Sequence, residues 1–275
     1  MEPQPDTNMD LLPVLISIPH GGDQIPPEVE DRICLTSPDI FYDGDSLTKD
    51  IFGFKNQVAA LLDTPIARAV VDLNRKAADR PLNYSDGVVN AISLKGTAVY
   101  HCNRFPDEEL IQALLDRYYH PYHQQLDELV NKPGIRIALD CHSMLPYSPP
   151  FSNSRRHRRP LICLSNGGDN LGCPLKNGKQ TTCSPDTIQQ LAECFRVSFE
   201  IPDSEVTIND PFSGGYIIQS HFKGNIPWIQ VEINKSLYLT MPTKKQPSSI
   251  AYSAKKIDRV KEKVWMAFKL FFLNF

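Results

Sequence analysis

The stretch Leu11–Gly22, LLPVLISIPHGG, indicates the fold. An apolar run of strand length, residues 11–18, ends abruptly in Pro19, His20 and two glycines. This pattern predicts a buried β-strand that stops at a sharp turn, with the imidazole of His20 in that turn.

The same arrangement recurs at three further positions in the chain. IARAVV precedes Asp72–Arg75, IRIAL precedes Asp140–Ser143, and IPWIQV leads directly into Glu232. Each segment ends in residues able to bind a metal, move a proton or hold an anion. Open α/β sheets place their sites in a crevice at the carboxyl ends of the strands, so we expect these four strand ends to line one site.

The composition favours one domain spanning residues 1–275, with an ordinary core built from 41% hydrophobic residues. Lys and Arg number 29 against 32 Asp and Glu, a net charge of −3, which gives no general electrostatic reason to expect nucleic acid or an anionic membrane as partner.

Seven cysteines without CxxC spacing favour reduced thiols. The polar first ten residues and the lack of a long apolar run predict a soluble, cytoplasmic protein, and the oligomeric state is left open.

Hydrophobic periodicity predicts an α/β fold, a mixed, mainly parallel sheet flanked by helices. Helices are expected at residues 46–62, 106–130, 184–199 and 248–272. Strands are expected at residues 11–18, 66–71, 135–140, 161–164, 206–208, 216–221 and 228–233. Residues 23–45 should form a loop with one short helix. The long polar segment 76–105 leaves a strand end, and loops of this length more often line a site than fill space.

His20 and His142 are the candidate metal ligands, because each follows an apolar strand on a different segment. Catalytic zinc takes three protein ligands from His, Asp and Glu and keeps a fourth position for water. The third ligand would be a carboxylate, either Asp23, three residues after His20, or Asp45 in the Asp-Gly-Asp turn. Spacing does not choose between them. Asp140, two residues before His142, lies on the same side of an extended strand and suits the role of acceptor for an imidazole N–H.

Glu232 interrupts an otherwise apolar strand. Burying a lone charge costs several kcal/mol, so this carboxylate must be paired, associated with a metal or placed at the rim. A general base and a structural ion pair are both consistent with the pattern. Asn74 and Arg75 place an amide and a planar guanidinium at a strand end, which suits a substrate carboxylate, although a salt bridge would use the same groups.

Other polar groups are expected to be structural. The basic run Arg155–Arg159 lies on a loop flanked by Pro and Ser, which is typical of a solvated segment rather than a nucleic-acid contact. His120 and His123 are three residues apart, but the intervening proline distorts that turn, so packing or exposure is favoured over metal binding. Cys141 alternates to the face opposite its histidine neighbour and is not expected to act as a nucleophile.

With these residues in place, the chain resembles the N-formylglutamate amidohydrolase family, which is similar in site layout to zinc carboxypeptidases and aspartoacylases. The matching segments follow the family order across residues 11–240, and they are Ile18-Pro19-His20-Gly21-Gly22, Asp43-Gly44-Asp45, Val71-Asp72-Leu73-Asn74-Arg75 with Arg80-Pro81-Leu82, Pro121-Tyr122-His123, Asp140-Cys141-His142-Ser143, Gly214-Gly215-Tyr216-Ile217 and Val231-Glu232-Ile233-Asn234-Lys235-Ser236-Leu237-Tyr238. No single segment is specific, but the ordered set is.

The resemblance implies a single-domain phosphorylase/hydrolase-like α/β fold and a hydrolase with one Zn²⁺ per chain. His20 and His142 would bind the zinc, and Glu232 would be the general base. Arg75 and Asn74 would anchor the α-carboxylate of the substrate and orient it for catalysis.

The resemblance also bears on the third zinc ligand and on two further residues, Arg80 and Gln219. The family's recurring Asp-x-Asp turn favours Asp45 as the third zinc ligand, whereas the aspartoacylase-like pattern, with its acid three residues after the histidine, keeps Asp23 as an alternative. Arg80 belongs to a matching segment and is expected to contact substrate. Formylglutamate hydrolases resemble one another in an Arg shortly after the Gly-Gly turn, and Gln219 stands at that position here, which affects the expected substrate but not the chemistry.

The implied function is cleavage of an N-acyl amino acid such as N-formyl-L-glutamate, a small-molecule substrate, by metal-activated water. The rival interpretation is a non-catalytic binding protein that uses the same pocket for an anionic amino-acid derivative. The paired histidines and Glu232 favour the enzyme, because a pure binder needs no general base.

Overall fold

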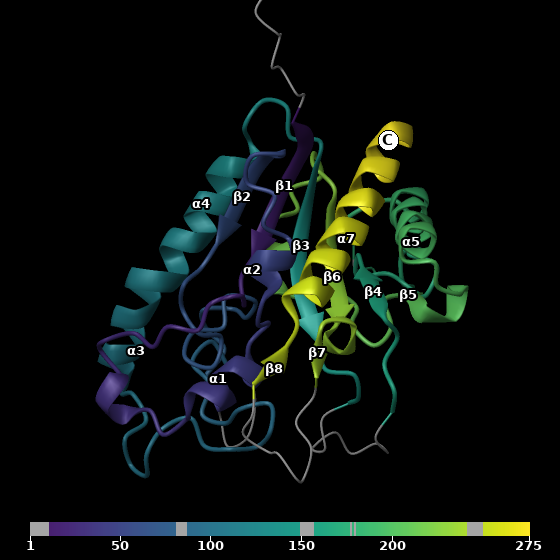
Figure 1. Cartoon of the computed structure of the whole chain (residues 1–275). Helices are drawn as coiled ribbons and strands as arrows, with labels where there is room; N and C mark the ends of the chain where they lie inside the picture. Colours follow the sequence, from purple (N-terminus) through teal and green to yellow (C-terminus); the bar gives the residue numbers. More distant parts are fainter. Residues whose placement is uncertain (1–10, 81–86, 149–156, 177, 179, 241–249) are drawn as a thin grey trace, which may run out of the picture.

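A six-stranded sheet organises the protein (Figure 1). The computed structural model describes residues 11–80, 87–148, 157–176, 178, 180–240 and 250–275. The sheet strands are β1 (Leu12–Ile18), β2 (Val58–Asp63), β3 (Ile137–Met144), β4 (Ile162–Ser165), β5 (Val206–Ile208) and β6 (Trp228–Asn234). Their order is β2-β1-β3-β6-β4-β5, and every neighbouring pair is parallel except β4 with β6. The predicted mixed, mainly parallel sheet is confirmed.

Helices cover both faces of this sheet (Figure 1). One face carries α3 (Glu108–Leu114) and α4 (His120–Val130), and the other carries α5 (Pro185–Phe199) and α7 (Ala254–Asn274). The shorter elements are α1 (Ser37–Asp43), α2 (Thr48–Ile51), α6 (Tyr216–His221), 3-10 turns at Glu30–Arg32, Asp203–Glu205 and Lys235–Leu237, and the strand pair β7 (Leu239–Thr240) and β8 (Ala251–Tyr252). None of the helices in the described ranges is long and apolar enough to cross a membrane.

The central strands are apolar on both faces because both faces are covered. Val14, Ile16 and Ile18 of β1 pack in the cluster that includes Phe195 of α5 and Phe268 of α7. The alternate residue Leu15 packs with the α3 and α4 side chains. This explains the continuous apolar run at the start of the chain, since a strand buried on both faces has no polar alternation.

The helix predicted at residues 106–130 is present, with an irregularity in its middle. Asp107 caps α3 through its side chain, which accepts a hydrogen bond from the Leu110 N–H. A π-helical segment, Leu115–Tyr119, then leads into α4, whose second residue is Pro121. Proline has no N–H and clashes with the carbonyl of the preceding turn, so a widened turn just before it relieves that conflict.

The helix predicted at residues 46–62 is wrong. Only one turn, α2, forms there, and residues 58–63 are instead the edge strand β2. Gly53 ends the turn in a tight bend, where an added Cβ would lie 2.3 Å from the Lys49 carbonyl oxygen. The apolar residues had helical spacing, but those after Gly53 alternate between buried and half-buried, as in a strand.

Two predicted strands are also wrong. Residues 66–71 form only isolated bridges to Gly22 and Gln24 and then a turn, although five of them are buried apolar side chains. Residues 216–221 form helix α6. In both cases the apolar content reports burial, and burial alone does not distinguish strand from coil or helix over six residues.

At the C-terminus the predicted helix 248–272 is observed as α7, beginning at Ala254 after strand β8. The start expected at Ser248 lies outside the described residues. The predicted strands at 161–164, 206–208 and 228–233, the helix at 184–199 and a short helix within 23–45 are confirmed to within two residues.

Candidate metal centre and active site

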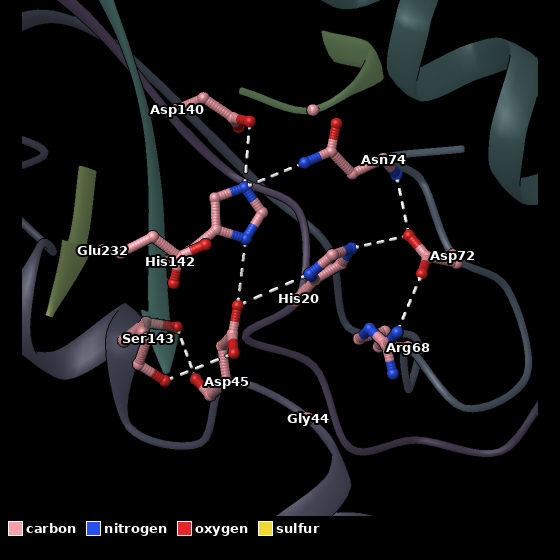
Figure 2. A network of polar contacts seen from close by, with 12 residues as sticks. His20, Gly44, Asp45, Arg68, Asp72, Asn74, Asp140, His142, Ser143 and Glu232 are labelled. Carbon is pink, nitrogen blue, oxygen red and sulfur yellow. Dashed lines mark hydrogen bonds and ion pairs between the residues drawn. The ribbon is translucent and has the colours of Figure 1, made fainter. Parts of the chain in front are cut away.

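Three segments bring His20, Asp45 and His142 together beside the ends of β1 and β3 (Figure 2). His20 lies two residues beyond β1, and His142 lies within β3, which extends past the predicted end of that strand. Asp45 lies in the turn between α1 and α2, and its N–H donates to the His20 carbonyl (2.9 Å). All three side chains are buried, and one ligand atom from each lies within 4.8 Å of the others.

The hydrogen bonds of both imidazoles point to a cation between them. Asp45 Oδ2 lies 3.0 Å from His142 Nδ1 and 3.4 Å from His20 Nδ1. On the far side of the rings, His20 Nε2 contacts Asp72 (2.8 Å) and His142 Nε2 contacts Asp140 (2.9 Å). Ionised carboxylates only accept, so each Nε2 carries the proton in a neutral ring, and both Nδ1 lone pairs then face the Asp45 carboxylate. Such a cluster of lone pairs is stable around a positive charge, and carboxylates behind ligating imidazoles are usual in metal sites.

The pKa values of His20, His142 and Asp45 also indicate that this site favours positive charge. Burial alone would lower the pKa of His142 and His20, but the carboxylates around them outweigh it, and both pKa values are raised. Burial would raise the pKa of Asp45, yet its contacts with the two histidines hold that pKa well below the ordinary range. The donors are two imidazoles and one carboxylate, which is a set suited to catalytic zinc.

The turn that carries Asp45 is held from several directions. The Ser143 hydroxyl donates to Asp45 Oδ1 (3.2 Å), and the Thr48 hydroxyl donates to the Asp45 carbonyl (2.6 Å). The buried Lys235 Nζ donates to the Gly44 carbonyl (2.6 Å). The carboxylate is therefore oriented before any ligand arrives.

Asp23, the alternative third ligand, lies elsewhere. It is exposed and lines a shallow surface depression together with Ile40 and Phe41. Asp45 is the carboxylate that the structure brings to the two histidines.

Glu232 lies beside the histidine cluster. It is the register partner of His142 across the parallel strands β3 and β6, so the two side chains are on the same side of the sheet (Figure 2). In the described part of the chain its carboxylate accepts one hydrogen bond, from Gln230 Nε2 (2.9 Å). Burial raises the pKa of Glu232 to about 7. A carboxyl group with this pKa can accept and return a proton near neutral pH.

These residues line one cavity of about 460 Å³. His20, Asp45, His142 and Glu232 form part of its wall, and three arginines, Arg68, Arg75 and Arg159, also line it. The predicted crevice at the strand ends is therefore observed.

The sequence is similar to known proteins over most of its length. The family model for N-formylglutamate amidohydrolase matches residues 12–239. The chain belongs to this amidohydrolase family. It is 26% identical over 237 residues to the N-formylglutamate deformylase of Pseudomonas putida, covering 83% of this chain and 82% of the relative, and 24% identical over the same length to that of Pseudomonas aeruginosa. Family membership makes it a hydrolase that acts on an amide.

Solved structures share the fold of the family. The N-formylglutamate amidohydrolase of Ralstonia eutropha is 18% identical and superposes with a TM-score of 0.73, over 96% of this chain and 94% of that one. The gene product Atu2144 of Agrobacterium tumefaciens is 16% identical and has a TM-score of 0.59, over 94% and 88% of the two chains. The α/β architecture predicted from the sequence is therefore that of an amidohydrolase.

Asn74 and Arg75, the predicted carboxylate anchors, lie at the cavity wall. The Asn74 amide oxygen accepts from the Ile217 N–H (2.8 Å), and its Nδ2 lies 3.3 Å from His142 Nε2. Gly215 packs directly against this amide, where a Cβ would lie 2.2 Å from Nδ2. The Asn74 side chain thus joins the α6 turn to the histidine cluster, while Arg75 is 39% exposed at the mouth of the cavity.

Arg80 and Gln219 do not line the cavity. Arg80 pairs with Glu108 at the start of α3 (2.9 Å), and its neighbours Pro81 and Leu82 lie outside the described residues. Gln219 lies on α6, with its Nε2 buried near Gly167. The structure therefore gives neither residue a contact with the cavity.

Two interactions were not predicted from the sequence. Arg68 bridges Asp43 and Asp72, with both N–O distances 3.2 Å, and so fixes the carboxylate behind His20. Lys235 holds the turn carrying Asp45, as described above. Arg68 lies within a segment predicted as an ordinary strand, and its position in an apolar run was the available signal of a buried ion pair.

The two described arginines of the basic run, Arg158 and Arg159, lie in different surroundings. Arg155 and Arg156 lie outside the described residues, and Arg158 is exposed and pairs with Glu205 (2.7 Å). Arg159, at the end of the run, is half-buried in the cavity wall. Its interpretation as part of a solvated segment is wrong for this residue, because the chain turns inward there to begin β4.

Proposed function

We propose that the protein is a zinc-dependent amidohydrolase that cleaves an N-acyl amino acid, with N-formyl-L-glutamate as the first substrate to test. His20, Asp45 and His142 would hold one zinc ion per chain. The observation that carries the proposal is the convergence of both imidazole Nδ1 atoms on Asp45, with each Nε2 held by a second carboxylate. The Pseudomonas relatives bear the name of this deformylase activity.

Zinc, when bound, would lower the pKa of a coordinated water and polarise the amide carbonyl. Glu232 accepts the proton of the attacking water and returns it to the departing amine, since its pKa of about 7 suits both directions of transfer. Arg75 binds the α-carboxylate at the mouth of the cavity and so orients the amide for attack. With N-formyl-L-glutamate and water, the products are formate and glutamate.

Side chains around the cavity would hold the metal ligands in position for this reaction. Lys235 and Ser143 fix Asp45, and Arg68 fixes Asp72 behind His20. These contacts hold the candidate ligands in fixed orientations, which limits the reorganisation that the reaction requires.

The test combines elemental analysis with turnover, on wild type, His142→Ala and the control His120→Gln. His120 is an exposed histidine on α4. We expect about one zinc per chain in wild type and control, its loss in His142→Ala, and release of formate from N-formyl-L-glutamate only where zinc is retained. A wild type that holds no metal after zinc has been supplied and the excess removed would contradict the proposal. Tight binding of the substrate without turnover would instead favour the binding protein.

A further inference from the structure

The guanidinium of Arg159 lies in the cavity wall with no carboxylate of the described residues at ion-pair distance. Burial lowers the pKa of Arg159, and the charge of Glu232 only partly opposes this. In the described part of the chain, Arg159 Nε is buried with no hydrogen-bond partner. The side chain stacks on the Phe212 ring, with Cζ 4.8 Å from the ring centroid. A partly desolvated cation is costly unless an anion compensates it, so this position is suited to receive a negatively charged group.

The backbone of Arg159 is fixed. Its N–H donates to the Pro146 carbonyl beyond the end of β3 (2.9 Å). Asn234, the last residue of β6, donates from Nδ2 to the carbonyls of Arg159 (3.4 Å) and Pro160 (2.9 Å). The guanidinium is therefore placed by the same strand ends that carry His142 and Glu232.

Arg75 and Arg159 lie on opposite sides of the reactive groups. Arg75 follows Asp72, which binds His20 at the end of β1, whereas Arg159 precedes β4. Strands β3 and β6 lie between β1 and β4, so His142 and Glu232 lie between the end of β1, where Asp72 binds His20, and the segment of Arg159. The two arginine side chains line the same cavity, with Glu232 of β6 between the two segments.

We propose that Arg159 determines substrate specificity by binding a second carboxylate, at the end of the substrate side chain. This inference rests on the proposed function. An N-acyl amino acid attacked beside Glu232 would direct its α-carboxylate to Arg75 and its side chain toward Arg159. The preferred substrate class is then N-acyl derivatives of acidic amino acids, and Arg159 supplies the recognition that Gln219, outside the cavity, does not.

The test compares two ligands that differ only in the distal charge, N-formyl-L-glutamate and N-formyl-L-glutamine. Arg159→Met is matched with Arg158→Met, which removes the neighbouring exposed arginine outside the cavity. Binding is measured by calorimetric titration in the Glu232→Gln background with the metal removed, so that residual turnover does not interfere. We expect Arg159→Met to weaken binding of formylglutamate by about 10- to 100-fold and that of formylglutamine by no more than about twofold. Arg158→Met should leave both unchanged.

The rival roles of Arg159 predict other results. If Arg159 only shapes the cavity, both ligands will lose affinity equally. If it acts only on Glu232, neither ligand will lose affinity in the Glu232→Gln background. Either result overturns the proposal. Failure of the parent protein to distinguish the two ligands would overturn it as well. Arg159→Lys, which keeps the charge without the planar fork, should recover part of the discrimination. Turnover by the wild type tests the proposed function separately, because these titrations do not depend on it.

Discussion

Asp45 and Glu232 are buried carboxylates that line the same cavity, but the pKa of Asp45 is lowered and the pKa of Glu232 is raised. Burial favours the neutral acid in both. In Asp45 the contacts with His142 and His20 outweigh burial and lower the pKa. Glu232 accepts a hydrogen bond from Gln230 alone among the described residues, and burial raises its pKa to about 7. A permanently ionised carboxylate suits a metal ligand, and one that titrates near neutrality suits a base.

Replacing Glu232 with Gln separates these two roles. The amide keeps the size of the side chain but cannot accept the proton of water, so we expect kcat to fall by about 10²- to 10⁴-fold while the zinc content stays at the wild-type level. Formate release and elemental analysis on the same preparation give both values. Glu193→Gln, on an exposed position of α5, is the control. A Glu232→Gln enzyme with nearly wild-type kcat would exclude Glu232 as the base.

How far the site could be predicted from the sequence differs from residue to residue. His20, His142 and Glu232 could be selected because each interrupts or ends an apolar strand. Spacing did not choose between Asp45 and Asp23, and only the family resemblance favoured Asp45, because the position of Asp45 depends on its N–H bonding to the His20 carbonyl, a contact between distant segments. Arg159 was missed because a charge run normally indicates solvent, and only the path of the backbone into β4 turns its last member inward.

The helical segment 108–130 supports the site through its second half. Tyr119 donates from its hydroxyl to the Arg75 carbonyl (2.8 Å), and His123 Nε2 contacts the Leu73 carbonyl (3.0 Å). His123 Nδ1 lies 2.8 Å from His221 Nε2 on α6. The π-helical segment before Pro121 contains Tyr119, so the helix irregularity lies at the contact with the segment that carries Arg75. His123 therefore contacts the segment that carries Arg75 and is not part of the His20, Asp45 and His142 group.

His123 should make the protein sensitive to acid. Burial, followed by the neighbouring His221, lowers its pKa to about 4, against 6.5 for an unperturbed histidine. The unfolded chain therefore takes up a proton first as the pH falls. The stability contributed by the neutral ring is complete above pH 6.5 and is lost toward pH 4. We expect the acid-induced decrease in unfolding free energy to be about 1–2 kcal/mol smaller in His123→Gln.

Urea titrations at several pH values between 7.5 and 4.5 measure this difference. His120→Gln lies on the same helix but is exposed, and it should follow the wild-type curve. An equal loss of stability in His123→Gln and wild type would show that the ring is not kept neutral by the fold.

The sheet and its two helical layers follow from apolar segments that are long or clearly bounded. β1, β3, β6, α5 and α7 were predicted because capping residues, turns or sustained periodicity mark them. The segments 46–62, 66–71 and 216–221 were assigned wrongly. The first has helical spacing of its apolar residues, the other two are short and mostly apolar, and in each the conformation is decided by neighbours that the sequence does not reveal. In the first case Gly53 and pairing with β1 decide it; in the second, the apolar side chains fill the core from a turn.

Metal binding should stabilise the whole molecule, because its three candidate ligands come from β1, the α1–α2 turn and β3. Without the ion, the paired carboxylates and imidazoles are left at close range in a buried site. A ligand present at about 1,000 times its Kd stabilises the folded state by about 4 kcal/mol. For a chain of this size that corresponds to a Tm roughly 10 °C higher. Removing the metal with a chelator should lower the Tm by this amount, and added zinc should restore it.

His142→Ala should start near the lower Tm and respond to neither treatment, whereas His120→Gln should behave as wild type. A wild-type Tm unaffected by chelator and zinc alike would show that His20, Asp45 and His142 hold no structural metal, whatever the activity.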